Sequence, residues 1–438
     1  MKITRTTRVG LLAGAVALAG TSITACGTGD ASSDGKGTIS FLTGNDVTST
    51  TLGKDLIAAF EKQNPSIKVK LDTQPGGQTA DNLVKTKLAT GEMDDVFYYN
   101  SGSLMQALNP DNFLVDLSDQ SWAGNLTKDF KASVSTDKGL YGAPLGTSLA
   151  GGVMYNRNVY KKLGLTVPTS WREFIANSKK IKSADPSVAP VLQSYGDTWT
   201  SQTMILGDYA NIQAQHAGWA AEYTAGRAKY ADPPALASFQ HLAELNDDGL
   251  LNKDFASMTN AAALKAVATG TGAQYPMLSS LVATILQNQP HAVDNVGFFA
   301  LPADDAADTT LTVWQPSAVY IPRTTTGAKL EAAKKFVAFI NSPSGCAIQN
   351  RDFTPSGPYT ISNCKLPNKG PSLLDDVQKY FDEHKTASAL EFQSPVKGPN
   401  LENIAVQVGS GLTSASKGAS LYDQDVKKQA QQLGLKGW

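Results

Sequence analysis

The sequence is poor in cysteine and histidine, and neither sign of charge dominates. Its 438 residues include 3 cysteines and 4 histidines, and 38 Lys and Arg residues nearly balance 39 Asp and Glu residues. No block of basic residues is present, which argues against a nucleic-acid partner. The histidines share no metal-ligand spacing with one another or with a cysteine, so we expect no metal site. They are His216, His241, His291 and His384.

Long apolar runs are equally scarce. The one apolar stretch, residues 9–20, follows the basic residues Lys2, Arg5 and Arg8. It is too short, and too rich in Gly and Ala, to be a durable membrane span, which needs about 20 apolar residues. A basic start, a short apolar segment and small residues before Cys26 indicate a cleaved export signal over residues 1–25.

The end of this signal, Ile23-Thr24-Ala25-Cys26, resembles the bacterial lipobox. The resemblance implies that Cys26 becomes the lipid-bearing first residue of the mature protein and anchors it to the outer face of the cell membrane. Each buried methylene of the lipid contributes ~0.8 kcal/mol to that attachment. An ordinary signal peptidase site with a soluble product is the alternative. Residues 26–37, rich in Gly, Ser, Thr and Asp, are expected to form a flexible tether.

The rest of the chain is long enough for two or three ordinary domains. It contains two cysteines, Cys346 and Cys364. In an exported protein such a pair favours a disulfide over a redox or metal site. Two buried free thiols are the alternative.

Strand and helix patterns alternate after the tether. Residues 38–43 predict a buried strand, residues 52–60 a helix that stops at Asn64-Pro65, and residues 67–71 an alternating strand. A helix over 80–90 and a strand over 95–99 repeat the unit, and another helix starts at Ser103. This order predicts an α/β fold with a parallel sheet, whose ligand-binding loops lie at the carboxyl ends of the strands.

The later segments are strands on either side of a mainly helical middle, which predicts two interleaved lobes. Ser170 and Glu173 are placed to form a capping box at a helix start, and Ser103 and Gln106 could form another. The expected strands cover 140–145, 152–156, 292–302 and 312–322, and the expected helices cover 199–267 with breaks, 327–341, 375–384, 403–410 and 421–433.

Several stretches, in this order along the chain, resemble the family 1 extracellular solute-binding proteins: residues 60–69, 89–96, 139–144, 153–156, 162–165, 168–174 and 332–337. These proteins are the carbohydrate-binding lipoproteins of ABC importers and are similar in fold to maltose-binding protein. The serial order of the stretches carries the resemblance, since each has a structural explanation by itself. One departure is Trp314-Gln315-Pro316-Ser317, where many relatives have a Gly-Gly pair.

The resemblance implies a two-lobed, type II periplasmic-binding-protein-like fold joined by crossing hinge segments. Lobe 1 would comprise residues 38–147 plus 316–354, and lobe 2 residues 148–315 plus 355–438. The ligand would lie in the cleft between the lobes.

Candidate ligand-binding residues are polar and aromatic residues at strand ends and crossings, because sugars present hydroxyl groups and apolar ring faces. Trp199 and Trp314 are the expected stacking surfaces. Turn formation is the alternative role of Asn45 and Asp46, and helix capping that of Asn100 and Ser101. The candidates are Asn45, Asp46, Asn100, Ser101, Ser148, Tyr195, Trp199, Tyr275, Trp314, Gln315 and Asp352.

These features predict an extracytoplasmic substrate-binding lipoprotein of an ABC importer. It would bind a carbohydrate, with an oligosaccharide slightly favoured, and deliver it to a membrane permease as a monomer without a cofactor. No Gly-x-Ser-x-Gly elbow and no histidine-based ligand motif is present in the sequence, so we expect no enzyme. The alternatives are a membrane-tethered glycoside hydrolase and a surface sugar receptor that feeds a sensor.

Overall fold

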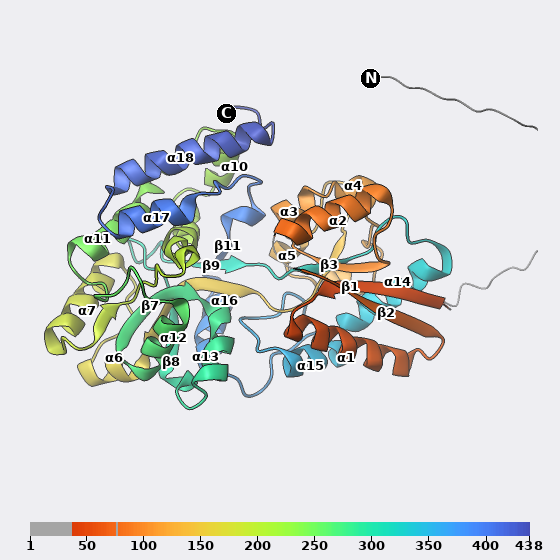
Figure 1. Cartoon of the computed structure of the whole chain (residues 1–438), viewed down its shortest axis with the longest axis horizontal. Coiled ribbons are helices and arrows are strands. Elements are labelled where there is room, and N and C mark those ends of the chain that lie inside the picture. The colour runs from red at the N-terminus through yellow and green to blue at the C-terminus, as the bar shows by residue number, and fades with distance from the viewer. Residues whose placement is uncertain (1–36, 76–77) are drawn as a thin grey trace, which may run out of the picture.

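The computed structural model describes residues 37–75 and 78–438, which form two α/β lobes side by side (Figure 1). One sheet has the strand order β2-β1-β3-β10-β4, and the other has the order β11-β9-β5-β7-β6 with β8 paired to β5. The predicted two-lobed α/β fold is confirmed. The export signal, Cys26 and nearly all of the tether lie outside the described residues.

The sheet of lobe 1 begins with the predicted strand-helix-strand unit. Strand β1 (Gly37–Gly44) pairs in parallel with β2 (Ile67–Gln74) and β3 (Val96–Tyr99), and helices α1 (Val47–Gln63) and α2 (Gln78–Thr90) connect them. Two antiparallel strands, β10 (Ala318–Tyr320) and β4 (Gly142–Pro144), complete the sheet.

A compact aromatic core holds this sheet to its helices. Phe336 of α14 (Gly327–Ile340) packs against Phe41 and Phe60, with ring centroids 5.3 and 5.1 Å away, and all three side chains are buried. The other helices of lobe 1 are α3 (Ser103–Gln106), α4 (Pro110–Phe113), η1 (Ala123–Asn125), α5 (Lys128–Ser133) and α15 (Pro343–Asp352).

Lobe 2 is built around β5 (Leu149–Asn156), in which every residue after Leu149 is buried. It pairs with β7 (Gly272–Leu278), β8 (Val296–Ala300) and β9 (Leu311–Trp314). Strands β6 (Ala189–Val191) and β11 (Thr386–Ser388) lie outside β7 and β9.

The helices of lobe 2 cover both faces of this sheet. They are α6 (Arg157–Leu163), α7 (Trp171–Ala184), η2 (Thr198–Gln202), α8 (Thr203–Gly207), α9 (Tyr209–Gln215), α10 (Trp219–Thr224), α11 (Leu236–Asp247), α12 (Asn260–Thr269), η3 (Ser279–Leu281), α13 (Val282–Asn288), η4 (Val293–Asn295), α16 (Leu373–Asp382), η5 (Leu390–Phe392), α17 (Leu401–Gly409) and α18 (Ala415–Gln432). None of the helices within 37–75 and 78–438 is long and apolar enough to cross a membrane.

The two predicted capping boxes have different outcomes. Ser170 and Glu173 cap α7 reciprocally, as the sequence predicts. Ser103 and Gln106 do not form a box, because Gly102 occupies the cap position and the Gln106 amide donates to the Ser135 carbonyl at 2.9 Å.

The chain passes between the lobes around residues 146–148, 315–317 and 365–372. Strands β4 and β5, on either side of the first passage, belong to different sheets, and so do β9 and β10. The expected boundary at 354 is too early, because Ile361 and Cys364 are buried in the core of lobe 1. Cys346 and Cys364 form a disulfide with a Cα–Cα distance of 5.4 Å, which holds that segment to lobe 1.

Candidate ligand-binding cleft

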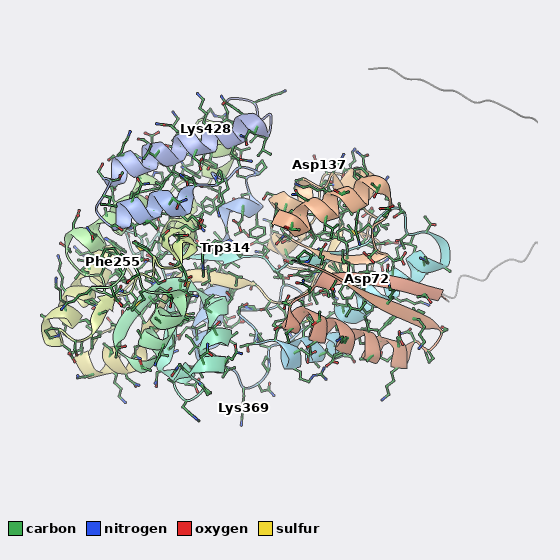
Figure 2. All side chains as sticks on the ribbon, viewed as in Figure 1. Asp72, Asp137, Phe255, Trp314, Lys369 and Lys428 are labelled. Carbon is green, nitrogen blue, oxygen red and sulfur yellow. A yellow bond between two sulfur atoms is a disulfide. The ribbon has the colours of Figure 1, made fainter. Side chains whose placement is uncertain are left out.

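A cleft of about 690 Å³ lies between the lobes, beside the crossing segments. Four aromatic rings line it, from Tyr98, Trp314, Phe353 and Phe392, together with several Ser and Thr residues. Figure 2 shows Trp314 at the junction of the two lobes. The volume falls within the ~300–1,000 Å³ that is usual for small-molecule sites. Rings and hydroxyl groups from both lobes therefore face one shared cavity.

Trp314 is the last residue of β9, and its indole packs against Gly151 of the neighbouring strand β5. A Cβ atom on Gly151 would lie 2.6 Å from Cζ3 of the indole, so the ring occupies space that only glycine leaves free. The indole also lies near the carboxyl group of Glu391, which lines the cleft as well. Burial raises the pKa of Glu391 above its usual value, although the nearby Lys397 and Trp314 side chains act in the opposite direction. Both contacts hold the ring in one orientation.

Gln315 follows Trp314 at the second crossing and is 8% exposed. Its Nε2 atom donates to Ser388 Oγ at 3.0 Å, while its Oε1 atom is buried and has no hydrogen-bond partner within the described structure. An unpaired buried acceptor costs about 1–3 kcal/mol. Gln315 is also one of the residues that line the cleft.

Asn100 and Ser101 line the lobe 1 side of the cleft, directly after β3. The Ser101 hydroxyl donates to the carbonyl of Pro316 at 2.8 Å, which ties this loop to the second crossing. The Asn100 carbonyl accepts from the Tyr320 hydroxyl at 2.9 Å, and its side chain is exposed. This pair therefore lines the cleft together with two other predicted residues, Trp314 and Gln315.

Two further loop candidates of lobe 1, Asn45 and Asp46, lie beside the cleft but do not line it. The Asp46 carboxylate accepts from the Ser49 N–H at 2.9 Å and caps α1, which is the local role that the sequence left open. Thr48 and Ser49 line the cleft in their place. Asp352 is also outside the lining, and its carboxylate pairs with Arg351.

Buried candidates at and beyond the first crossing point into protein. Ser148 is 1% exposed and donates to the Pro358 carbonyl at 2.8 Å. Tyr275 is completely buried, and its hydroxyl bonds Ser194 and Asn260. These side chains do not reach the cleft, because their partners lie within the core and the hinge.

The loop of residues 195–199 in lobe 2 also lies outside the cleft lining. Tyr195 is buried against Phe255, which Figure 2 shows in lobe 2, away from the junction of the lobes. Trp199 in η2 is 37% exposed, yet it is absent from the cleft wall. A tryptophan in a polar loop is a weak indicator of position, because the sequence does not show which face of the lobe the loop occupies.

The cleft residues that the sequence analysis missed are mainly Tyr98, Glu391, Phe392 and Lys397. Tyr98 is the second-to-last residue of β3, and its burial raises the pKa of its hydroxyl. The other three lie between β11 and α17, in a stretch that no helix or strand period marks. Their one available signal is a local cluster of an aromatic ring, two charges and Pro395.

Residues 46–345 match the model of the bacterial extracellular solute-binding proteins, and the chain belongs to that family. The family consists of binding proteins without catalytic function, which confirms both the predicted resemblance and the expectation that the chain is no enzyme.

Named relatives extend over most of the chain. It is 25% identical over 388 residues to the multiple sugar-binding protein of Streptococcus mutans, covering 86% of this chain and 88% of that protein. It is 23% identical over 359 residues to the melibiose/raffinose/stachyose-binding protein of Bacillus subtilis, covering 75% and 76%. A Bacillus subtilis binding protein solved in an open conformation has a TM-score of 0.76 at 16% identity, covering 91% of this chain and 99% of that one. At that identity the structural match shows the fold alone.

Proposed function

We propose that this protein is the sugar receptor of an ABC importer, which binds an oligosaccharide between its lobes and delivers it to a membrane permease. The observation that carries the proposal is the cleft itself, which aromatic rings from both lobes line together with the amide residues Asn100 and Gln315 and several hydroxyl groups. Sugar rings stack on aromatic faces, and their hydroxyl groups donate to such acceptors. The sugar-binding names of the two relatives support this ligand class.

Ligand binding is coupled to movement of the lobes. A sugar that touches Asn100 in lobe 1 and Trp314 in lobe 2 stabilises the arrangement in which both walls reach it. The ligand thereby shifts the population toward the closed state by its differential affinity for that state. The permease would recognise the closed state, and the receptor would act as a monomer without a cofactor.

The lipid on Cys26 is part of the proposed mechanism. Attachment keeps the receptor close to the permease, so delivery depends on a local effective concentration instead of diffusion from solution. Metabolic labelling of the expressed protein with a fatty-acid probe tests this step. We expect labelling of the wild type and none of Cys26→Ser, while equal labelling would remove the anchor from the proposal.

A thermal-shift screen of the mature protein against mono- and oligosaccharides tests the ligand class. A sugar at a concentration of 100 Kd is expected to stabilise the protein by about 2.7 kcal/mol. Isothermal titration then gives Kd, and an assay for released reducing sugar follows the fate of the ligand. Binding without turnover supports the receptor, and turnover would support the glycoside hydrolase instead.

A further inference from the structure

Residues 389–397, here called the cleft wall segment, are fixed to lobe 2 by alternate side chains. Leu390 and Val396 are buried in the core of lobe 2, and Ser394 is 3% exposed with its hydroxyl 2.8 Å from Thr224 Oγ1. The Ala389 N–H donates to the Val313 carbonyl of β9 at 2.8 Å. The segment is therefore part of the lobe and not a free loop.

The intervening side chains of the cleft wall segment face the other lobe. Glu391, Phe392, Pro395 and Lys397 line the cleft. Because neighbours such as Leu390 and Val396 are held in the core, these side chains project from a firm base. The packing therefore fixes how far the Phe392 ring extends from lobe 2.

Phe392 extends to the backbone of lobe 1 at Gly102. A Cβ atom on Gly102 would lie 2.6 Å from Phe392 Cδ1 and 3.1 Å from the Glu391 carbonyl oxygen. Gly102 also has a φ of 71°, which other residues rarely adopt. The glycine thus lets the two lobes touch here, with the phenyl ring against the start of α3.

This contact separates two hollows between the lobes. The cleft of about 690 Å³ lies on one side, and a hollow of about 250 Å³ lies on the other. Both are lined by Ser103, Glu391, Phe392 and Pro395, so the phenyl ring and its neighbours form the partition. The smaller hollow continues past Gln106 and Gln393, which carry amide groups. The smaller hollow by itself is below the ~300 Å³ that is usual for a ligand site. Joined to the cleft, however, it would make the cleft longer.

We propose that Phe392, seated on Gly102, is a stop that ends the sugar-binding cleft on this side and limits how many sugar units it accepts. The inference rests on the proposed function. Removal of the ring would join the two hollows into one groove, and the amides beyond the ring would then meet additional hydroxyl groups. Phe392 thus determines ligand length, while the rings of Trp314 and Phe353 provide the surface of the cleft.

The test compares the length preference of the wild type and of Phe392→Ala by isothermal titration. The probes are a maltooligosaccharide series from the disaccharide to the heptasaccharide, together with melibiose, raffinose and stachyose. We expect the ratio of affinities, longest over shortest, to rise about tenfold in the variant, which corresponds to about 1.4 kcal/mol of new contacts. Phe392→Leu keeps apolar packing with a shorter reach, and it is expected to shift the ratio in the same direction by less.

Phe353→Ala is the matched control, since Phe353 lines the same cleft from lobe 1, directly after α15, and has no part in the partition. It should weaken binding of all lengths and leave the ratio unchanged. If the wild type binds sugars and both Phe392 variants keep its length profile, or lose affinity uniformly, the stop is refuted. If the wild type binds none of the probes, the proposed function fails and the stop fails with it. A shift of the ratio confined to the Phe392 variants supports the stop.

Discussion

The two walls of the cleft come from different kinds of local structure. Lobe 1 contributes the rings of Tyr98 and Phe353 and short polar side chains at a strand end and a helix start, such as Asn100 and Ser49. Lobe 2 contributes large rings and charges, such as Trp314 and Glu391, from a strand end and from the cleft wall segment. Each lobe thus supplies two rings, whereas the charged side chains among the residues that line the cleft, Glu391 and Lys397, come from lobe 2. The difference indicates that lobe 2 carries most of the selectivity and lobe 1 completes the enclosure.

The largest expected effect that tests this comparison is loss of the Trp314 ring. Trp314→Ala is expected to weaken sugar binding about thirtyfold or more, since buried aromatic anchors contribute about 2 kcal/mol or more. Titration with the tightest ligand of the screen measures it, and circular dichroism checks the fold. Trp199→Ala is the control, because the Trp199 indole is outside the cleft lining. The affinity of this variant should stay within twofold of that of the wild type. Equal losses in both variants would move the ligand away from this cleft.

A smaller effect is expected when the ring is displaced and not removed. In Gly151→Ala the added methyl group would overlap the Trp314 indole, and overpacking of this kind costs about 1–3 kcal/mol. We expect about a tenfold loss of affinity and a blue or red shift of tryptophan fluorescence. Gly124→Ala in lobe 1 is the matched control, because nothing lies within 4 Å of its added atom. Unchanged binding by Gly151→Ala would show that the position of the Trp314 ring is not critical for affinity.

The next effect compares one hydrogen-bonding group from each part of the site. Gln315→Leu removes the unpaired acceptor, and a net hydrogen bond is worth about 1 kcal/mol, so about a fivefold loss is expected. Ser49→Ala in lobe 1 should change affinity less than twofold. Titrations under identical conditions decide between them, and a larger loss for Ser49→Ala would reverse the assignment of selectivity.

The smallest effect concerns pH and the Glu391 carboxyl. Its pKa is raised above the ordinary 4.5 by burial, so the folded protein holds this proton more tightly than the unfolded chain does. The contribution of this group to stability is therefore full below pH 4.5 and is lost as pH rises through the raised pKa. Glu391→Gln lacks this dependence. Urea unfolding of both proteins between pH 4 and 8 should show the variant gaining relative stability as pH rises, and parallel curves would contradict the assignment.

The sequence predicts the cleft residues at strand ends better than those of the cleft wall segment, for a physical reason. Asn100 and Ser101 follow a strand whose position in a parallel sheet the strand-helix order defines. Glu391 and Phe392 belong to a segment whose position depends on packing against β9 and Thr224, which no local pattern encodes.

Single-residue offsets account for other differences. Ser148 lies between Thr147 and Leu149, which both line the cleft, while its own side chain points to Pro358. Neighbouring side chains of an extended chain point to opposite sides. The sequence alone does not show which of the two alternating sets points into the cleft. Asp46 has a different cause, because its carboxylate caps α1, and Thr48 and Ser49 of that helix line the cavity instead.

The disulfide has a consequence for how the lobes move. Between its two cysteines the chain leaves the core of lobe 1, reaches lobe 2, where Ser279 donates to the Ser356 carbonyl at 2.6 Å, and returns at Ile361. Both ends of this excursion are fastened to lobe 1, so rotation of one lobe against the other has to be absorbed by the few residues around Ser356. The disulfide thereby holds in lobe 1 both ends of a segment that lines the cleft through Phe353 and Ser356.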